Sequence, residues 1–247
     1  MPSRPSPPII ELRQYTLHPG QRDVLIALFD REFVESQEAV GIQVLGQFRN
    51  LDRPDTFTWL RGFDSMPSRA SALGAFYDGP VWTRHRDAAN ATMIDSDNVL
   101  LLKPVNVPDG FWYPRERPGA NAREIAPGLL VATICTPAAS AYVDFARWFS
   151  EQLAPILATA GGAPLATLET EPSANSFPRL PVREGERVFV WFSRFDDVAA
   201  FGEHRARFEE ELDRAPEVKE SLSRQLRAPM EILRLTPTAR SRLAAIA

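Results

Sequence analysis

Two eight-residue segments, FTWLRGFD at 57–64 and FVWFSRFD at 189–196, share the pattern F-x-W-x-x-x-F-D and decide the fold. Two further pairs keep the same order: IIELRQYT (9–16) corresponds to LLVATICT (129–136), and VLLLKP (99–104) corresponds to ILRLTP (232–237). The separation between copies grows from 120 residues upstream to 132–133 downstream because the second copy carries an insertion, EPSANSFPRLPVREGE (171–186). The sequence therefore predicts two related repeats in one chain.

Proline-rich segments are expected to flank and join the repeats, because proline sustains neither a helix interior nor an inner strand. Five segments follow: a flexible N-terminal arm (1–8), the first repeat (9–104), a linker (105–127), the second repeat (128–237) and a C-terminal tail (238–247). The linker contains Phe111-Trp112-Tyr113, and exposing three consecutive aromatic side chains is unfavourable. We therefore expect the linker to pack against a surface.

Each repeat has the element order βαββαβ. In the first repeat we expect strands at 9–16, 42–49, 56–63 and 99–102, and helices at 21–38 and at 67–93, the latter broken near 78–80. In the second repeat we expect strands at 129–136, 167–170, 188–195 and 231–235, and helices at 139–160 (kinked by Pro155) and 198–226. This order is that of a ferredoxin-like unit with a four-stranded antiparallel sheet.

The predicted fold class is therefore α+β. Helices cover only one face of each ferredoxin-like sheet, so the other face must be covered as well. Two repeats in one chain satisfy this need if their sheets pack on each other. The sequence thus predicts a dimeric α/β barrel formed within one polypeptide.

Composition excludes several classes of function. The formal net charge is −4 and no basic stripe occurs, so we expect no nucleic-acid partner. No apolar run reaches the roughly 18 residues of a membrane span, and MPSRPSPP lacks the apolar core of a signal peptide. We therefore expect a cytoplasmic protein. One cysteine and three scattered histidines offer no metal-ligand spacing, so we expect no metal and no cofactor.

The segment FYDGPVWTRHRDAANATM (76–93) carries an unusual set of side chains for one helix. With Asp78 as the expected N-cap and Pro80 in the first turn, one helix face carries Trp82, His85 and Ala89, flanked by Arg86 and Asn90. His85 is the candidate general acid or base, because the ordinary pKa of histidine lies near neutrality.

The other candidate site residues would form and orient a pocket around His85. Trp82 and Tyr77 would wall it, and Arg86, Asn90 and Arg13 would bind anionic or carbonyl oxygens. In the alternative interpretation, Trp82 fills the core and His85 binds a neighbouring carbonyl. Haem binding with His85 as the axial ligand is a further alternative, which no sequence feature requires.

The first strand supplies a second candidate cluster. Alternation places Ile10, Leu12 and Gln14 on one face and Glu11, Arg13 and Tyr15 on the other. We expect the first set to meet the helices and the second set to point between the sheets. Because buried charges must be paired, this second set forms either a structural Glu–Arg network or part of a ligand site.

The second repeat lacks both polar sets. Val218, Ser221 and Leu226 stand opposite Trp82, His85 and Asn90, and Val131, Thr133 and Cys135 stand opposite Glu11, Arg13 and Tyr15. This asymmetry predicts one site per chain, in the first repeat. Independent drift of the two repeats would produce the same difference.

Three segments of the first repeat resemble the NIPSNAP family: IELRQYTLHPGQ (10–21), FTWLRGFDS (57–65) and FYDGPVWTRHRDAANATM with the following DNVLLL (76–102). The resemblance implies the dimeric α/β barrel fold. It implies no settled activity, because the family has none, although its mitochondrial animal members are described as adaptor proteins. Other barrels of this superfamily include cofactor-free monooxygenases, which is an analogy of fold only.

Two functions of different classes are compatible with these observations. In the first, the chain binds a small organic ligand in the first repeat and acts as a cofactor-independent enzyme. In the second, it is a non-catalytic interaction or adaptor protein that uses the linker aromatics, the insertion or an outer helix. We also expect association into homo-oligomers.

Overall fold

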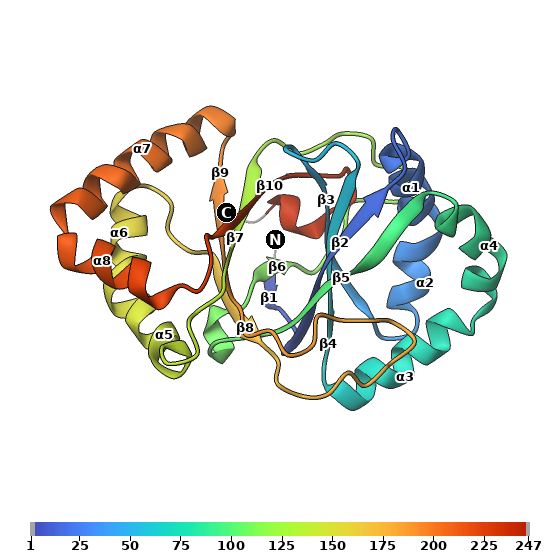
Figure 1. Cartoon of the computed structure of the whole chain (residues 1–247). Helices are drawn as coiled ribbons and strands as arrows, with labels where there is room; N and C mark the ends of the chain where they lie inside the picture. Colours follow the sequence, from blue (N-terminus) through green and yellow to red (C-terminus); the bar gives the residue numbers. More distant parts are fainter. Residues whose placement is uncertain (1–2, 246–247) are drawn as a thin grey trace.

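Eight antiparallel strands close into a single barrel in the order β10-β3-β4-β2-β5-β8-β9-β7. Figure 1 shows this barrel in the computed structural model, which describes residues 3–245, with helices on its two opposite sides. The first half contributes β2 (Ile9–Leu17), β3 (Gln43–Asn50), β4 (Thr56–Phe63) and β5 (Met93–Pro104). The second half contributes β7 (Leu129–Cys135), β8 (Ala166–Thr170), β9 (Phe189–Phe195) and β10 (Glu231–Pro237).

Strand order is the same in both halves. In each, the first strand lies between the third and the fourth, which is the antiparallel order of a ferredoxin-like unit. The halves join where β5 pairs with β8 and where β10 pairs with β3. The predicted fold class is confirmed, and the two sheets are joined edge to edge by hydrogen bonds, so the barrel has no free edge.

Helices α1 to α4 cover the first half and α5 to α8 the second (Figure 1). The first set comprises α1 (Arg22–Leu28), the π-helical turn η1 (Phe29–Phe33), α2 (Val34–Glu38), α3 (Met66–Tyr77) and α4 (Pro80–Asn90). The second set comprises α5 (Tyr142–Trp148), the π-helical turn η3 (Phe149–Leu153), α6 (Ala154–Thr159), α7 (Val198–Arg214) and α8 (Pro216–Gln225). Because both halves carry the π-helical turn and only the second has a proline beside it, Pro155 does not cause the irregularity.

Capping residues fix the ends of α3 and α4. Ser65 accepts a hydrogen bond from the backbone N–H of Ser68 at the start of α3, which is one half of a capping box. Asp78 was expected to cap α4, but it ends α3, and Gly79 is the N-cap of α4. The break between the helices is therefore as predicted, shifted by one residue.

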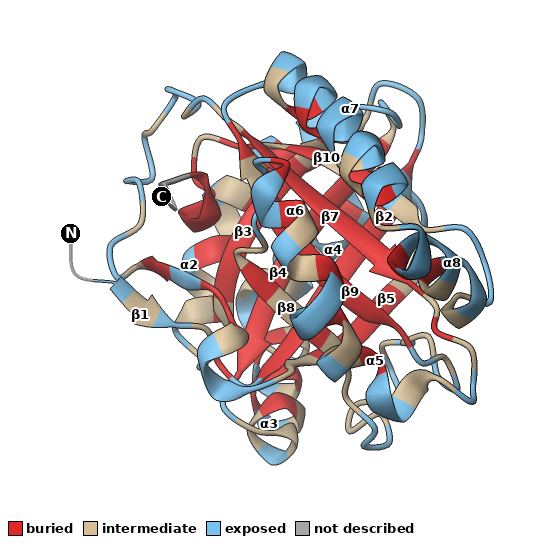
Figure 2. Ribbon diagram, turned by 90° about the vertical axis from the view of Figure 1, so that its left-hand side faces the viewer, coloured by how far each residue is buried: buried red, intermediate tan, exposed pale blue. Residues whose placement is uncertain are grey.

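The predicted orientation of β2 is wrong. Ile10 and Leu12 belong to the apolar core inside the barrel, whereas Tyr15 belongs to the core between the barrel wall and the helices. Glu11 and Arg13 alternate with the interior residues and so also face the helices. The physical reason is that side chains from all eight strands fill the barrel interior. The face of β2 that carries Ile10 and Leu12 therefore points inward, where Figure 2 shows the buried strands.

Segments outside the two halves complete the core. Residues Ser3–Pro5, expected in a flexible arm, form β1 and pair with β6 (Trp112–Pro114) of the linker. Phe111 and Tyr113 are buried in the barrel core together with Leu243. Phe111 follows the short helix η2 (Val107–Asp109), and Leu243 belongs to the terminal helix η4 (Arg242–Ala245). Trp112 is 54% exposed, so the prediction that the linker packs down holds for two of its three aromatic residues. No helix within residues 3–245 is long and apolar enough to cross a lipid bilayer.

Substituting Phe111 by alanine should lower the free energy of unfolding by about 3–5 kcal/mol, because a fully buried ring that packs on Phe192 is removed. The matched change, Trp112→Ala, should alter it by less than about 1 kcal/mol because that side chain is largely exposed. Denaturant unfolding of both variants tests this, and equal losses would show that the linker does not fill the barrel core.

Candidate functional site

A cavity of about 100 Å³ lies in the first half, between the barrel wall and the helices. Seven aromatic side chains line it: Tyr15, Phe29, Phe33, Trp59, Phe76, Tyr77 and Trp82. Gln37, Asn90 and Ser96 add polar groups, and the exposed Asn90 marks the side that faces solvent. A mostly apolar pocket with a few polar groups is the usual form of a small-molecule site.

A larger groove, of about 690 Å³, runs along the surface beside Lys103, Glu169 and Arg187. Its lining contains none of the buried polar atoms that lack a hydrogen-bond partner. The cavity in the first half does contain such an atom, and for this reason it is the stronger candidate.

The π-helical turn places aromatic rings against the barrel wall. Phe29 lies 4.7 Å from Trp59, ring centre to ring centre, and Phe33 lies 5.5 Å from Trp82. The second half has the corresponding pair, Phe149 and Trp191, at 5.1 Å. Aromatic packing is therefore shared by both halves and belongs to the fold, so the site must be defined by what only the first half has.

Two residues of the cavity wall, Trp59 and Tyr15, carry hydrogen-bond donors for which the described residues supply no acceptor. The indole Nε1 of Trp59 is buried and has no hydrogen-bond partner among the described residues. The hydroxyl of Tyr15 accepts a hydrogen bond from Arg13 Nε at 2.9 Å, which leaves its own proton available. Burial raises the pKa of Tyr15, so the hydroxyl stays protonated near neutral pH. An unpaired buried donor costs about 1–3 kcal/mol, which a ligand oxygen would recover.

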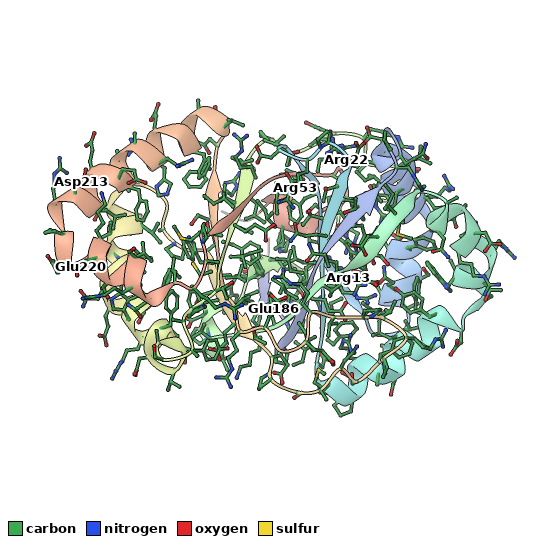
Figure 3. The ribbon with its side chains drawn as sticks, in the orientation of Figure 1. Arg13, Arg22, Arg53, Glu186, Asp213 and Glu220 are labelled. Atoms are coloured by element: carbon green, nitrogen blue, oxygen red, sulfur yellow. The ribbon has the colours of Figure 1, made fainter. Side chains whose placement is uncertain are left out.

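Behind this wall lies a fully buried ion cluster, centred on Glu11. Its carboxylate accepts hydrogen bonds from Arg13 at 2.6 Å and from Arg61 and Arg69 at 2.7 Å each. Burial alone would raise the pKa of Glu11, but the charges of Arg61, Arg13 and Arg69 outweigh it and hold that pKa well below its ordinary value. Figure 3 labels Arg13 in the first half, between β2 and the helices. Arg61 also donates to the side-chain oxygen of Gln37, which lines the cavity.

The second half shows that the fold does not need this cluster. Val131 pairs with Ser193 in β7 and β9 as Glu11 pairs with Arg61 in β2 and β4. At the offset of 120 residues between the repeats, Thr133 and Leu157 correspond to Arg13 and Gln37. At the downstream offset of 132 residues, Phe201 corresponds to Arg69. The same architecture is thus built with neutral residues in the second half, so the architecture as such does not require the charges.

Residues 10–108 match the protein-family model described as NIPSNAP. The first half of this chain is a NIPSNAP domain. A search of curated proteins finds no significant match to the chain.

The whole chain is similar in fold to solved structures of about the same length. A proposed monooxygenase from Fusobacterium nucleatum aligns with a TM-score of 0.57 and 10% identity, over 94% of this chain and 93% of that one. A proposed monooxygenase from Lactobacillus acidophilus aligns with a TM-score of 0.56 and 11% identity, over 94% of both chains. An anthrone oxidase-like protein aligns with a TM-score of 0.53 and 12% identity, over 100% of both chains. At these identities the likeness concerns the fold, and it extends over both halves.

The insertion of the second half, between β8 and β9, reaches across to α3 of the NIPSNAP domain (Figure 1) and contributes to the cavity lining. Leu180 lines the cavity, and the ring of Phe177 stacks on Tyr77 with centres 6.1 Å apart. Asn175 accepts a hydrogen bond from Arg69 at 3.0 Å, and Arg179 pairs with Asp78 at 2.7 Å. The sequence predicted a loop here but gave no sign of its destination.

Of the residues proposed from sequence, Tyr15, Tyr77, Trp82 and Asn90 line the cavity of the NIPSNAP domain. Glu11 and Arg13 form the ion cluster behind it. His85 and Arg86 lie elsewhere on α4. His85 Nε2 is 3.5 Å from the carboxylate of Glu32, outside the cavity lining, and Arg86 is exposed beside Asp87.

Sequence analysis missed several residues that complete the site. Trp59 was noticed only as part of the fold motif, and Gln37 and Leu180 were not singled out. Arg61 and Arg69 are 50 and 58 residues from Glu11 in the chain, so no local pattern connects them to it. The one available signal was that Arg61 alternates on the same strand face as Trp59.

Replacing Glu11 by glutamine should lower the free energy of unfolding at neutral pH by about 3–5 kcal/mol, because three buried guanidinium groups lose their only carboxylate. Because the folded-state pKa of Glu11 lies below its ordinary 4.5, its stabilising contribution is complete above about pH 4.5 and declines as the pH falls further. Denaturant unfolding should therefore show the difference between wild type and variant narrowing below pH 4.5. The surface change Glu32→Gln should cost less than about 1 kcal/mol. A difference that does not vary with pH would contradict the assigned cluster.

Replacing Asn175 by alanine should loosen the insertion without unfolding the barrel. The change removes hydrogen bonds to Arg69, to the backbone N–H of Phe177 and to the carbonyl of Leu180. Amide hydrogen exchange over 173–181 should quicken by about tenfold or more, since each lost bond is worth about 1 kcal/mol. The control Asn121→Ala, in the exposed linker, should leave this exchange unchanged. Unaltered exchange in the Asn175 variant would mean that these contacts do not hold the insertion.

Proposed function

We propose that this chain binds a small planar molecule in the cavity of its NIPSNAP domain and acts on it without a bound cofactor. The observation that carries the proposal is the unpartnered Nε1 of Trp59, a buried donor in an aromatic cavity. The Tyr15 hydroxyl is a second donor in the cavity wall, and a carbonyl or phenol oxygen is the ligand group that would accept from such donors. The aromatic walls favour a flat, unsaturated ring.

The size of the cavity limits the ligand. Its volume of about 100 Å³ is below the roughly 150 Å³ of an engineered cavity that binds benzene in another protein. A single ring with its substituent at the solvent side, near Asn90, therefore requires a small outward movement of the cavity lining. Movement of Leu180 with the insertion would admit a larger one.

Similarity of fold supports oxidation as the chemistry to test first. The fold is shared with proteins named as proposed monooxygenases and with an anthrone oxidase-like protein. This is an argument from fold, and it assigns no residue. Tyr15 and Trp59 would hold the ligand oxygen, and oxygen uptake in the presence of each bound ring compound would detect the reaction.

Titrating the protein with a panel of single-ring carbonyl and phenolic compounds should shift the indole N–H resonance of Trp59 downfield, because that N–H gains a hydrogen bond. Trp59→Phe identifies the resonance among the five tryptophans. Ala89→Leu should weaken binding by about tenfold or more, since Ala89 is buried in the cavity wall and the larger side chain fills the space. The neighbouring change Ala88→Leu, on the exposed face of α4, is the control. Binding that is unaffected by Ala89→Leu would place the ligand elsewhere.

A non-catalytic interaction protein is the second candidate, and the exposure of Trp112 favours it. Its neighbours Phe111 and Tyr113 are buried, so one large aromatic side chain is presented on a rigid strand. Aromatic residues of this kind are enriched at the centres of protein interfaces. Trp112→Ala would then abolish association with a partner while leaving ligand binding in the cavity unchanged.

A further inference from the structure

We infer that the ligand of the cavity is an anion, a single-ring aromatic carboxylate or phenolate, because an excess of buried positive charge lies directly behind the cavity wall. This inference rests on the proposed function and names the class of its ligand. It is carried by the charge, position and unpaired atoms of the cluster around Glu11.

The buried cluster has more positive than negative groups. Arg13, Arg61 and Arg69 are all buried and all pair with the single carboxylate of Glu11. Within residues 3–245 no second carboxylate lies within ion-pairing distance of these three guanidinium groups. Two positive charges are therefore left without a partner of opposite sign, and burial makes such an excess unfavourable.

The excess charge adjoins the cavity. The guanidinium carbons of Arg13 and Arg61 lie 5.6 and 5.1 Å from the ring centre of Trp59, and that of Arg13 lies 5.4 Å from the ring of Tyr15. Both rings form part of the cavity wall. The faces of the rings stabilise the cations in part, as cation–π contacts do. The Trp59 N–H and the Tyr15 O–H are the donors nearest to such a ligand oxygen. The positive field of the two guanidinium groups would favour the ionised form of that oxygen.

Unpaired atoms show that the cluster is not saturated. Nη2 of Arg61 and Nη2 of Arg69 are buried and have no hydrogen-bond partner among the described residues. Arg69 has a structural task, because it donates to Asn175 and Ser176 of the insertion. The described contacts of Arg61 are confined to Glu11, Gln37 and aromatic rings, so anchoring the insertion does not account for it.

The second half places neutral residues at the positions of these arginines. Ser193 and Thr133 occupy the positions of Arg61 and Arg13 in the second half, beside the equivalent tryptophan, Trp191. The buried charge excess thus lies in the half that holds the aromatic cavity, and the corresponding positions of the other half are neutral.

Benzoate and benzamide separate charge from shape, because they are nearly isosteric and differ in charge at neutral pH. Calorimetric titration should show benzoate binding about tenfold or more tightly than benzamide, with both shifting the Trp59 indole resonance. The preference should persist in about 0.5 M sodium chloride, because salt screens buried charges far less than exposed ones. A preference that disappears with salt would indicate attraction by surface arginines and overturn the inference.

Arg61→Met tests the source of the preference. The variant keeps two arginines on Glu11 and should lose most of the preference for benzoate, while its affinity for benzamide stays within about twofold of wild type. The control Arg86→Met, on the exposed side of α4, should keep the wild-type preference.

The failures of the two proposals are distinguishable. Equal affinities, or tighter binding of benzamide, would overturn the anionic ligand and leave ring binding in the cavity intact. Absence of binding by both probes and by the wider panel would overturn the proposed function as well. If Arg61→Met does not fold, the comparison of benzoate with benzamide binding to the wild-type protein still tests the inference.

Discussion

Edge-to-edge pairing of the two halves is the constraint on which the rest of the structure depends. Each half presents a four-stranded sheet with one face covered by its helices, and the other face can be buried only inside a closed barrel. The β5–β8 and β10–β3 ladders provide this closure and leave no strand edge exposed. Closure also brings the segment after β8 beside β5, from where the insertion reaches the cavity of the first half. The same strand pairing therefore closes the barrel and brings the insertion to the candidate site.

The two halves of the barrel differ in the charges that they bury, although their strands and helices occur in the same order. The first half buries four ionised side chains between sheet and helices, whereas the second fills the same layer with apolar and small residues such as Cys135, Phe149 and Leu157. Replacing a buried ion cluster by packed apolar residues is often neutral or stabilising. Packing of this layer therefore does not by itself require the cluster of the first half.

Motif spacing was sufficient to predict the fold, because the phenylalanine and tryptophan positions recur with the same order in both halves. It could not give the orientation of β2, since alternation defines two sets of residues without saying which set lies inside. Tyr77, Trp82 and Asn90 of the aromatic segment at 76–93 line the cavity, whereas His85 lies beside Glu32. Arg61, Arg69 and Leu180 could not be found in the same way, because their roles depend on contacts between distant segments.

The placement of the insertion has a consequence for how such a protein can change. In a barrel assembled from two identical chains, every substitution enters both halves, so a buried charge useful on one side burdens the other as well. When both halves belong to one polypeptide, a substitution in one half leaves the other half unchanged. One half of this chain holds the aromatic cavity and the buried ion cluster, while the other lacks these charges and contributes Phe177 and Leu180 beside the cavity. Asymmetry within one chain thus permits a division of labour that a symmetric pair of chains does not allow.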